Sequence, residues 1–499
     1  MRAKVVGRGS GWTAAPEPYT KNKGTCGRKR IVFVGASYKF VHKVLRDMLL
    51  AGGFEDCELV VHDIDPIPMN IVADLLDKIA RQKKTRIAVQ RTLDRREALK
   101  DADAVVLSIT IGGQESDARS SEVALRYGIR TGIGDTLGPA AFARNLRTVP
   151  FVVQLIQEME ELCPKAAMLN FTNPMSALTS AMARHGSLPV YGLCHSADEL
   201  FRYFAKVFAC RKGEVDLEIG GVNHQAFVTR LWVKGRERTG EILEGTQRSA
   251  AMLEDGLNAH RESVRMQQDV FKVLGAWPST GEDHLAEFYP FWLNERRMEQ
   301  FGFPLRHPLL PGREPYTRKE CPEIIHYWTY GPEPVGDLHL VTTEHAHELL
   351  WAHFTGQPYT RVLNILNAGE YIRGLPKDSC VEVLATVKGG KVSAKPITLP
   401  PAVHSLVQRW VTVHDLNIRA ALACDRQLAK QALMLDPHVR DFYDLEPLLD
   451  DFLKYLEPWM PRGWYAKGAV VQGFGGGNGQ HAHRAVKPAK RIRAKATAR

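Results

Sequence analysis

The sequence lacks the features that mark membrane and secreted proteins. It contains no run of about 18 apolar residues, which excludes an ordinary membrane-spanning helix. The first thirty residues carry basic side chains but no continuous apolar stretch, so they do not resemble a secretory signal. The eight cysteines are scattered without a CxxC pair. This usage favours free thiols in a reducing compartment, and we expect a cytoplasmic protein.

The net charge of +10 is concentrated near the two ends of the chain. The basic run "RKR" at residues 28–30 closes the segment 1–29, and residues 466–499 combine a glycine-rich stretch with "HRAVKPAKRIRAKATAR". Both segments are poor in large apolar residues, so we expect flexible basic tails around a folded region. No zinc-finger spacing or RNP motif occurs. The sequence therefore predicts no specific nucleic-acid partner.

The first organised segment is "RIVFVGASYKFVHKVLRDMLL", followed by "CELVVHDID". Residues 31–34 have strand character, Gly35 breaks the run, and apolar residues then recur at helical spacing. A second strand ends at Asp63, which could accept a hydrogen bond from a ribose hydroxyl. The glycine fingerprint is incomplete, because "GASYKF" has only one glycine. From these residues alone, a dinucleotide-binding site and a packed βαβ turn that binds no nucleotide are equally good interpretations.

Further strands and helices alternate up to about residue 195, which predicts an α/β, Rossmann-like, doubly wound parallel sheet over residues 30–195. Asn170 and Asn173, in "LNFTNP", follow a strand at the edge where such sheets bind ligands. An amide both donates and accepts, so it suits a nicotinamide ribose, as we expect for Asn170, or a sugar, as we expect for Asn173. The alternative is turn chemistry, since Asn-Pro commonly begins a turn.

Cys194, in "YGLCHS", and His224, in "GGVNHQAF", are the next candidates. A cysteine with a distant histidine is either a thiol nucleophile with its base or two ligands of one metal. Spacing alone does not choose between them. Residues 196–465 mix strands and helices and predict a C-terminal α+β domain that carries substrate, metal and subunit contacts. Within it, "KDSCVEVLATVKGGKVSAKPI" predicts a hairpin that turns at Gly389 and Gly390.

An ordered series of motifs resembles glycoside hydrolase family 4 from about residue 30 to 460. The series comprises "IVFVGAS", "LVVHDID", "YGIRTGIGDTLGPAAFARNLRTVP", "LNFTNPMSALTSAM", "YGLCHS", "GGVNHQAF" and "NAGEYIRGLPKDSCVEV". "CHS" is most similar to the α-galactosidase branch. The resemblance implies a Rossmann-like domain with a C-terminal α+β domain, as in the lactate and malate dehydrogenase-like fold.

The resemblance also implies NAD and a divalent metal, usually Mn²⁺, as cofactors. NAD would take a hydride from C3 of the sugar, a base would remove the C2 proton, and the C1 group would be eliminated. Water would then add and the hydride would return, so NAD is not consumed. By motif position, the metal ligands would be Cys194 and His224, the acid His195, the sugar-binding residues Arg119 and Asn173, and the NAD contacts Gly35, Ser37 and Asp63.

The base at C2 is sought in "STGEDHLAEFYPFW". Asp283 is favoured there and Tyr289 is the second choice, while capping and packing of a helix explain at least two of its polar residues. The substrate is expected to be an α-galactoside, with α-glucosides and α-glucuronides as alternatives. An NAD-dependent hydroxy-acid dehydrogenase and a non-catalytic sugar or nucleotide sensor are the rival classes. We expect a homo-oligomer, a dimer or tetramer.

Overall fold

The structure is a computed structural model that describes residues 21–465 except 39, 131–132, 195, 253–257, 295, 298–319 and 337–344. The C-terminal tail expected at 466–499, and residues 1–20 of the N-terminal tail, lie outside the described residues. In the described part of the chain, no helix is both long and apolar enough to cross a membrane.

The N-terminal half forms a parallel sheet in the order β3-β2-β1-β4-β5-β6. Its strands are β1 (Arg30–Val34), β2 (Glu58–His62), β3 (Ala88–Thr92), β4 (Ala104–Leu107), β5 (Ala167–Asn170) and β6 (Val190–Gly192). Side chains alternate between the two faces of β1: Ile31 and Phe33 join one hydrophobic core, and Val32 and Val34 join the other. Apolar residues are needed at consecutive positions because helices cover both faces.

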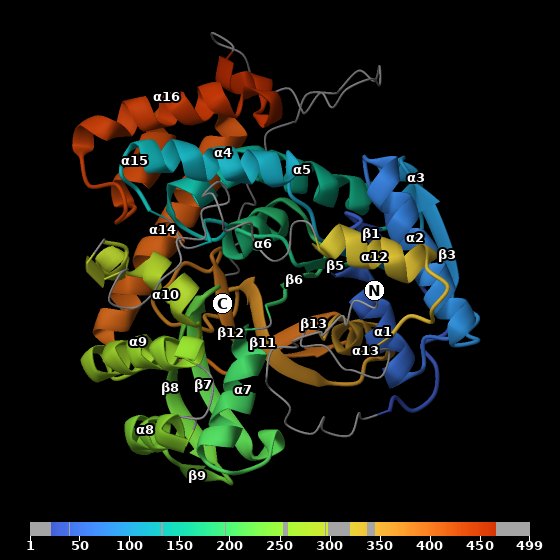
Figure 1. The fold of residues 1–499 in the computed structure, drawn as a ribbon, viewed down its shortest axis with the longest axis horizontal. Helices are drawn as coiled ribbons and strands as arrows, with labels where there is room; N and C mark the ends of the chain where they lie inside the picture. Colours follow the sequence, from blue (N-terminus) through green and yellow to red (C-terminus); the bar gives the residue numbers. More distant parts are fainter. Residues whose placement is uncertain are drawn as a thin grey trace, which may run out of the picture.

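Helices of the first half follow the strands and divide between the two faces (Figure 1). One core contains residues of α1 (Val41–Ala51) and α2 (Pro66–Gln82), and the other those of α3 (Arg95–Leu99), α4 (Gly113–Arg126), α5 (Gly138–Leu162) and α6 (Met175–His185). Asp65 caps α2 by accepting from the backbone N–H of Ile67, and Pro66 suits the first helical position. The doubly wound arrangement expected from the sequence is confirmed.

The sheet continues into the second half through antiparallel strands. β6 pairs with β11 (Tyr359–Leu366), which leads on through β12 (Cys380–Lys388), β7 (Val215–Val222) and β8 (Gln225–Val233) to β10 (Trp277–Pro278). Two short strands, β13 (Lys391–Ala394) and β9 (Arg236–Glu237), pair with β12 and β8. Gly389 and Gly390 form the turn between β12 and β13 with φ of 55° and 79°, so the predicted hairpin is confirmed.

The remaining helices in the described part of the chain pack partly beside the antiparallel strands and partly against the parallel half. They are α7 (Ser196–Val207), α8 (Ile242–Met252), α9 (Asn258–Leu274), α10 (Glu282–Phe288), α12 (Glu320–Tyr330), α13 (Ala346–Thr355), α14 (Pro401–Ala423), α15 (Arg426–Leu435) and α16 (Leu445–Tyr455). α14 packs on α5 and α6, α16 on α4, and α12 on α2, so the two halves share one sheet and interlocking helices (Figure 1).

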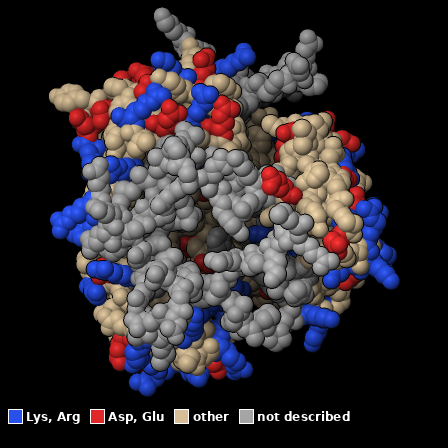
Figure 2. Space-filling view, in the orientation of Figure 1, with Lys and Arg blue, Asp and Glu red and all other residues tan. Residues whose placement is uncertain are grey.

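Charged side chains are mixed on the face shown in Figure 2. Basic and acidic groups alternate over α4 and α16 at the top of this view. Nearby, the contact between α15 and α16 includes ion pairs of Glu446 with Arg426 and with Lys430. Exposed pairs of this kind contribute little to stability individually, but they keep the surface charge balanced.

Candidate active site

The turn between β1 and α1 lies at the carboxyl end of the parallel strands. Gly35 has φ of 102°, and a Cβ there would collide with the carbonyl oxygen of Ser108, so only glycine fits. The backbone N–H of Ala36 donates to Asp63 Oδ2 over 2.7 Å, which ties the turn to the end of β2. Gly35, Asp63 and the half-buried Ser37 are therefore brought together where the sequence predicted NAD contacts.

Asn170 and Asn173 follow β5 but have different surroundings. Asn170 is fully buried, and its amide holds the turn through Thr172 and Thr179, at 2.9 to 3.2 Å. The cofactor role expected of Asn170 stays a prediction, and its donors already have partners within the protein. Asn173 instead donates from Nδ2 to Asp135 Oδ2 at 3.0 Å, and its buried Oδ1 has no hydrogen-bond partner among the described residues.

Cys194 and His224 meet although thirty residues separate them. Cys194 follows β6, and His224 lies in the two-residue turn between β7 and β8 with φ of 63°. The Cys194 Sγ and His224 Nε2 atoms are 3.1 Å apart, and both residues are buried. Thr136 Oγ1 lies 3.1 Å from His224 Nδ1 on the other side of the ring. The ring is therefore oriented so that Nε2 faces the thiol.

Neighbouring side chains support this pair. An Arg361 N–H donates to the carbonyl oxygen of Cys194 at 3.0 Å, and the His284 ring lies with its centroid 3.8 Å from that of His224. Glu382 is fully buried close by and accepts from the side-chain amides of Asn223 and Asn364. Burial raises the pKa of Glu382, against the lowering effect of His224 and these amides.

Asp135 links the asparagine turn to the cysteine–histidine pair. Its carboxylate accepts from Asn173 and from the hydroxyl of Thr136, which is 2.8 Å away. Burial by itself raises the pKa of Asp135, but electrostatic interactions with His284, Arg144 and His224, together with the hydrogen bond from Asn173, outweigh it and lower the pKa to about 2. Asp135 is thus ionised at neutral pH. Sequence reasoning did not assign a role to Asp135, although "GDTLGP" belonged to the motif series.

A buried glutamate fixes the loop that carries Asp135. Glu287, on α10, is 1% exposed and accepts from the backbone N–H groups of Ile133, at 2.6 Å, and Gly134. Its other oxygen lies 3.3 Å from His284 Nδ1. One side chain from the second half of the chain therefore holds a loop of the first half beside His224.

The other predicted residues are placed as follows. Tyr289 is buried, and its hydroxyl accepts from the Gln225 side chain at 3.4 Å. Burial raises the pKa of Tyr289 to about 12, which opposes its action as a base at neutral pH. Asp283 belongs to α10, but its side chain lies outside the described part of the structure, as does His195. Arg119 is not brought to this cluster, because it pairs with Glu115 on the exposed side of α4.

The thiol and imidazole suit a divalent transition metal. The Cys194 sulfur and the His224 Nε2 atom lie 3.1 Å apart, and both atom types are common ligands of such metals. Thr136 contacts the other ring nitrogen, Nδ1, and so orients the histidine for metal binding. Among the described residues, no group of three histidine, cysteine, aspartate or glutamate side chains is arranged to hold a metal ion.

Comparison with known proteins identifies the family. The model described as "Family 4 glycosyl hydrolase" matches residues 30–208, and "Family 4 glycosyl hydrolase C-terminal domain" matches residues 219–439. An α-galactosidase from Bacillus subtilis is 29% identical over 87% of this chain and 99% of its own. An α-galacturonidase from Thermoanaerobacterium saccharolyticum is 28% identical over 73% of this chain and 82% of its own.

A solved structure confirms the fold. The 6-phospho-β-glucosidase from Thermotoga maritima, determined with manganese, NAD⁺ and glucose-6-phosphate, superposes with a TM-score of 0.69. It is 22% identical and covers 86% of this chain and 99% of that chain. The chain belongs to glycoside hydrolase family 4. It is therefore a glycosidase, which decides against the hydroxy-acid dehydrogenase and the non-catalytic sensor.

Proposed function

We propose that this protein hydrolyses α-galactosides with NAD and a divalent metal, Mn²⁺ or a similar ion, as cofactors. The observation that carries the proposal is the approach of Cys194 Sγ to His224 Nε2, at 3.1 Å, beside the carboxyl ends of a Rossmann-like sheet. A plain dehydrogenase needs no such pair. The similarity to the Bacillus α-galactosidase supports the galactoside as substrate.

The side chains of this protein would divide the work between binding and proton transfer. When bound, NAD would accept and return a hydride, and the metal would polarise the sugar oxygens. Gly35, Ser37 and Asp63 would hold the dinucleotide at the β1–α1 turn, where the absence of a side chain lets the backbone approach a phosphate closely. Asn173 would bind a sugar hydroxyl through its unpartnered Oδ1.

Proton transfer would fall to two residues whose side chains the structure leaves undescribed. We propose His195 as the acid that assists the leaving group and Asp283 as the base at C2. The raised pKa of Tyr289 supports this choice of base, since a tyrosine base would need its pKa lowered. The adjacent His284 and His224 rings and the ionised Asp135 would keep this region polar where the chemistry occurs.

The cellular setting belongs to the same proposal. We infer a cytoplasmic protein, because the seven described cysteines are free thiols and a metal-binding thiol needs a reducing compartment. We also propose that the protein is a homo-oligomer. Size-exclusion chromatography with light scattering would test the oligomeric state. A monomer at micromolar concentration would contradict that part of the proposal.

The decisive experiment measures NAD dependence. Purified protein stripped of nucleotide should release the aryl group from an aryl α-galactoside only after NAD, Mn²⁺ and a thiol reductant are added back. NADH absorbance should not accumulate, since the hydride returns to the sugar. Aryl β-galactosides, α-glucosides, α-glucuronides and α-galacturonides complete the panel. Full activity after rigorous NAD removal would refute the proposal.

A further inference from the structure

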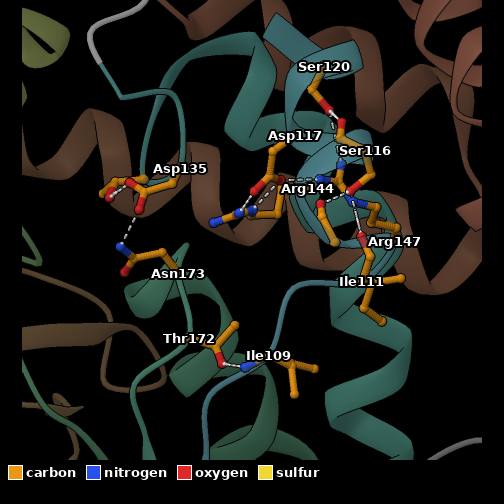
Figure 3. Close-up of polar contacts among 12 residues, drawn as sticks. Ile109, Ile111, Ser116, Asp117, Ser120, Asp135, Arg144, Arg147, Thr172 and Asn173 are labelled. Carbon is orange, nitrogen blue, oxygen red and sulfur yellow. Dashed lines mark hydrogen bonds and ion pairs between the residues drawn. The ribbon is translucent and has the colours of Figure 1, made fainter. Parts of the chain in front are cut away.

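An ion-pair cluster between α4 and α5 lies beside the site and has no part in the function described so far. Asp117 of α4 forms ion pairs with two arginines of α5 (Figure 3). Arg144 donates to both carboxylate oxygens, from Nε to Oδ1 at 3.0 Å and from NH2 to Oδ2. Arg147 donates to Oδ1 at 2.7 Å. The carboxylate is therefore held in one orientation by three charge-assisted hydrogen bonds.

Arg147 is the fixed end of the cluster. Its side chain is 0% exposed, and its other donors reach the carbonyl oxygen of Ile111 at 3.1 Å and the Ser120 hydroxyl at 3.2 Å. Each of its three guanidinium nitrogens thus has an acceptor inside the protein. Arg147 anchors Asp117, and it has no remaining nitrogen to offer a ligand.

Asp117 and Arg144 form the accessible end. The Asp117 side chain is 32% exposed, whereas that of Arg144 is 9% exposed. Arg144 interacts electrostatically with Asp135 as well as with Asp117. Figure 3 shows its guanidinium between the two carboxylates, with Asn173 beyond Asp135. The cluster is therefore continuous with the proposed sugar-binding side of the site, at Asn173.

Charge balance decides which ligands suit this end. Arg144 and Arg147 face two carboxylates, Asp117 and Asp135, so the formal charges of these four groups sum to zero and each arginine is already paired within the protein. Asp117 is the more exposed member of its pair with Arg144, and the polar atoms of its side chain are acceptor oxygens. A carboxylate accepts hydrogen bonds from sugar hydroxyls and repels a phosphate or another carboxylate.

We propose that Asp117, oriented by Arg144 and Arg147, is a specificity-determining residue that selects a neutral hexoside over a sugar that carries a carboxylate or phosphate. This inference rests on the proposed glycosidase function and specifies its substrate class. A relative named α-galacturonidase is 28% identical to this chain, so a uronide is a relevant competing substrate for the test. Selection would come from a favourable hydroxyl contact together with charge repulsion of the anionic competitor.

Asp117→Asn tests the charge with little change of volume. We expect kcat/KM for the accepted neutral aryl glycoside to fall about tenfold or more, the usual effect of losing a hydrogen bond to a charged acceptor. The kcat/KM for the matching uronide should fall less or rise, so that the ratio of the two changes at least about tenfold. Glu122→Gln is the matched control on α4, because Glu122 is exposed and pairs only along the helix with Arg126.

A second measurement does not depend on the folding of a variant. On the wild-type protein, the neutral sugar product should inhibit competitively at least about tenfold more tightly than its uronic acid counterpart. Equal or tighter inhibition by the uronic acid would overturn the inference, as would an unchanged substrate ratio in a folded Asp117→Asn protein. In both cases NAD-dependent hydrolysis would persist. Absence of hydrolysis of every glycoside in the wild type would refute the proposed function itself.

Discussion

Glu287 should control the order of the loop that carries Asp135. Its carboxylate accepts two backbone N–H groups, those of Ile133 and Gly134, at 2.6 and 2.5 Å. Hydrogen bonds to a charged group contribute about 1.5–3 kcal/mol each, so Glu287→Ala should lower the free energy of local opening of this loop by about 4 kcal/mol. Glu287→Gln keeps an acceptor oxygen without the charge, and we expect about half that loss.

Hydrogen exchange measured by mass spectrometry reports this free energy locally. In Glu287→Ala, the amides of Ile133 and Gly134 should exchange about a thousandfold faster than in the wild type, and in Glu287→Gln about thirtyfold faster, at about 1.4 kcal/mol per factor of ten. Hydrolytic activity should fall in the same order, because Asp135 and Thr136 position Asn173 and His224.

Asp269 provides the control, since it is exposed and pairs with Lys272 on α9. Asp269→Ala should change stability by no more than about 0.5 kcal/mol and leave loop exchange unaltered. Unchanged protection at Ile133 and Gly134 in Glu287→Ala would show that the carboxylate does not hold the loop. The reasoning from these two hydrogen bonds would then be wrong.

Three further predictions concern the metal, the base and acid stability. Cys194→Ser and His224→Ala should each weaken the affinity for Mn²⁺, measured by calorimetry, at least about tenfold, while the circular dichroism spectrum stays unchanged. Near-normal affinity in either variant would show that the substituted residue is not a metal ligand. Asp283→Asn should abolish most of the solvent deuterium found by NMR at C2 of the released sugar, whereas Tyr289→Phe should not; the reverse pattern would make Tyr289 the base. Burial, and to a smaller extent the charge of Arg184, lowers the pKa of His414 from 6.5 to about 4. Between these two pH values the unfolded chain binds a proton at His414, whereas the folded protein does not. The free energy of unfolding therefore does not depend on this group above pH 6.5, and it decreases as the pH falls towards 4. In His414→Gln, denaturation measured from pH 7 to 4 should show a decrease that is smaller by about 3 kcal/mol.

Local sequence patterns correctly predicted the elements whose conformation is determined by residues close to them in the chain. The strand, Gly35, helix and Asp63 of the first βαβ unit, and the hairpin at Gly389 and Gly390, all occur as expected. A glycine break and a change in apolar spacing are read within about twenty residues, so no tertiary information is needed. The requirement for glycine at position 35 has in addition a tertiary reason, since a Cβ there would strike the carbonyl oxygen of Ser108, which follows the neighbouring strand β4.

The residue type alone was a poorer guide to a residue's role where that role depends on the direction in which the side chain points. Arg119 and Arg144 are both helical arginines, but Arg119 faces outward to pair with Glu115, and Arg144 faces Asp117 beside the site. Asn170 and Asn173 are three residues apart, yet only Asn173 reaches Asp135. Helix rotation and a turn of the chain decide these directions, and both follow from packing that the local sequence does not encode by itself.

The sequence by itself determined the family and fold class, the polar residues at strand ends, and the prediction that Cys194 and His224 act together. Only the tertiary structure decided that Thr136 orients His224, that Glu287 holds the Asp135 loop, and that Asp117 meets two arginines of another helix. Thr136 is 88 residues from His224, and Glu287 is 154 residues from Ile133. Hydrogen bonds act over about 3 Å, so partners this distant in the chain are chosen by how the sheet and its helices bring them together.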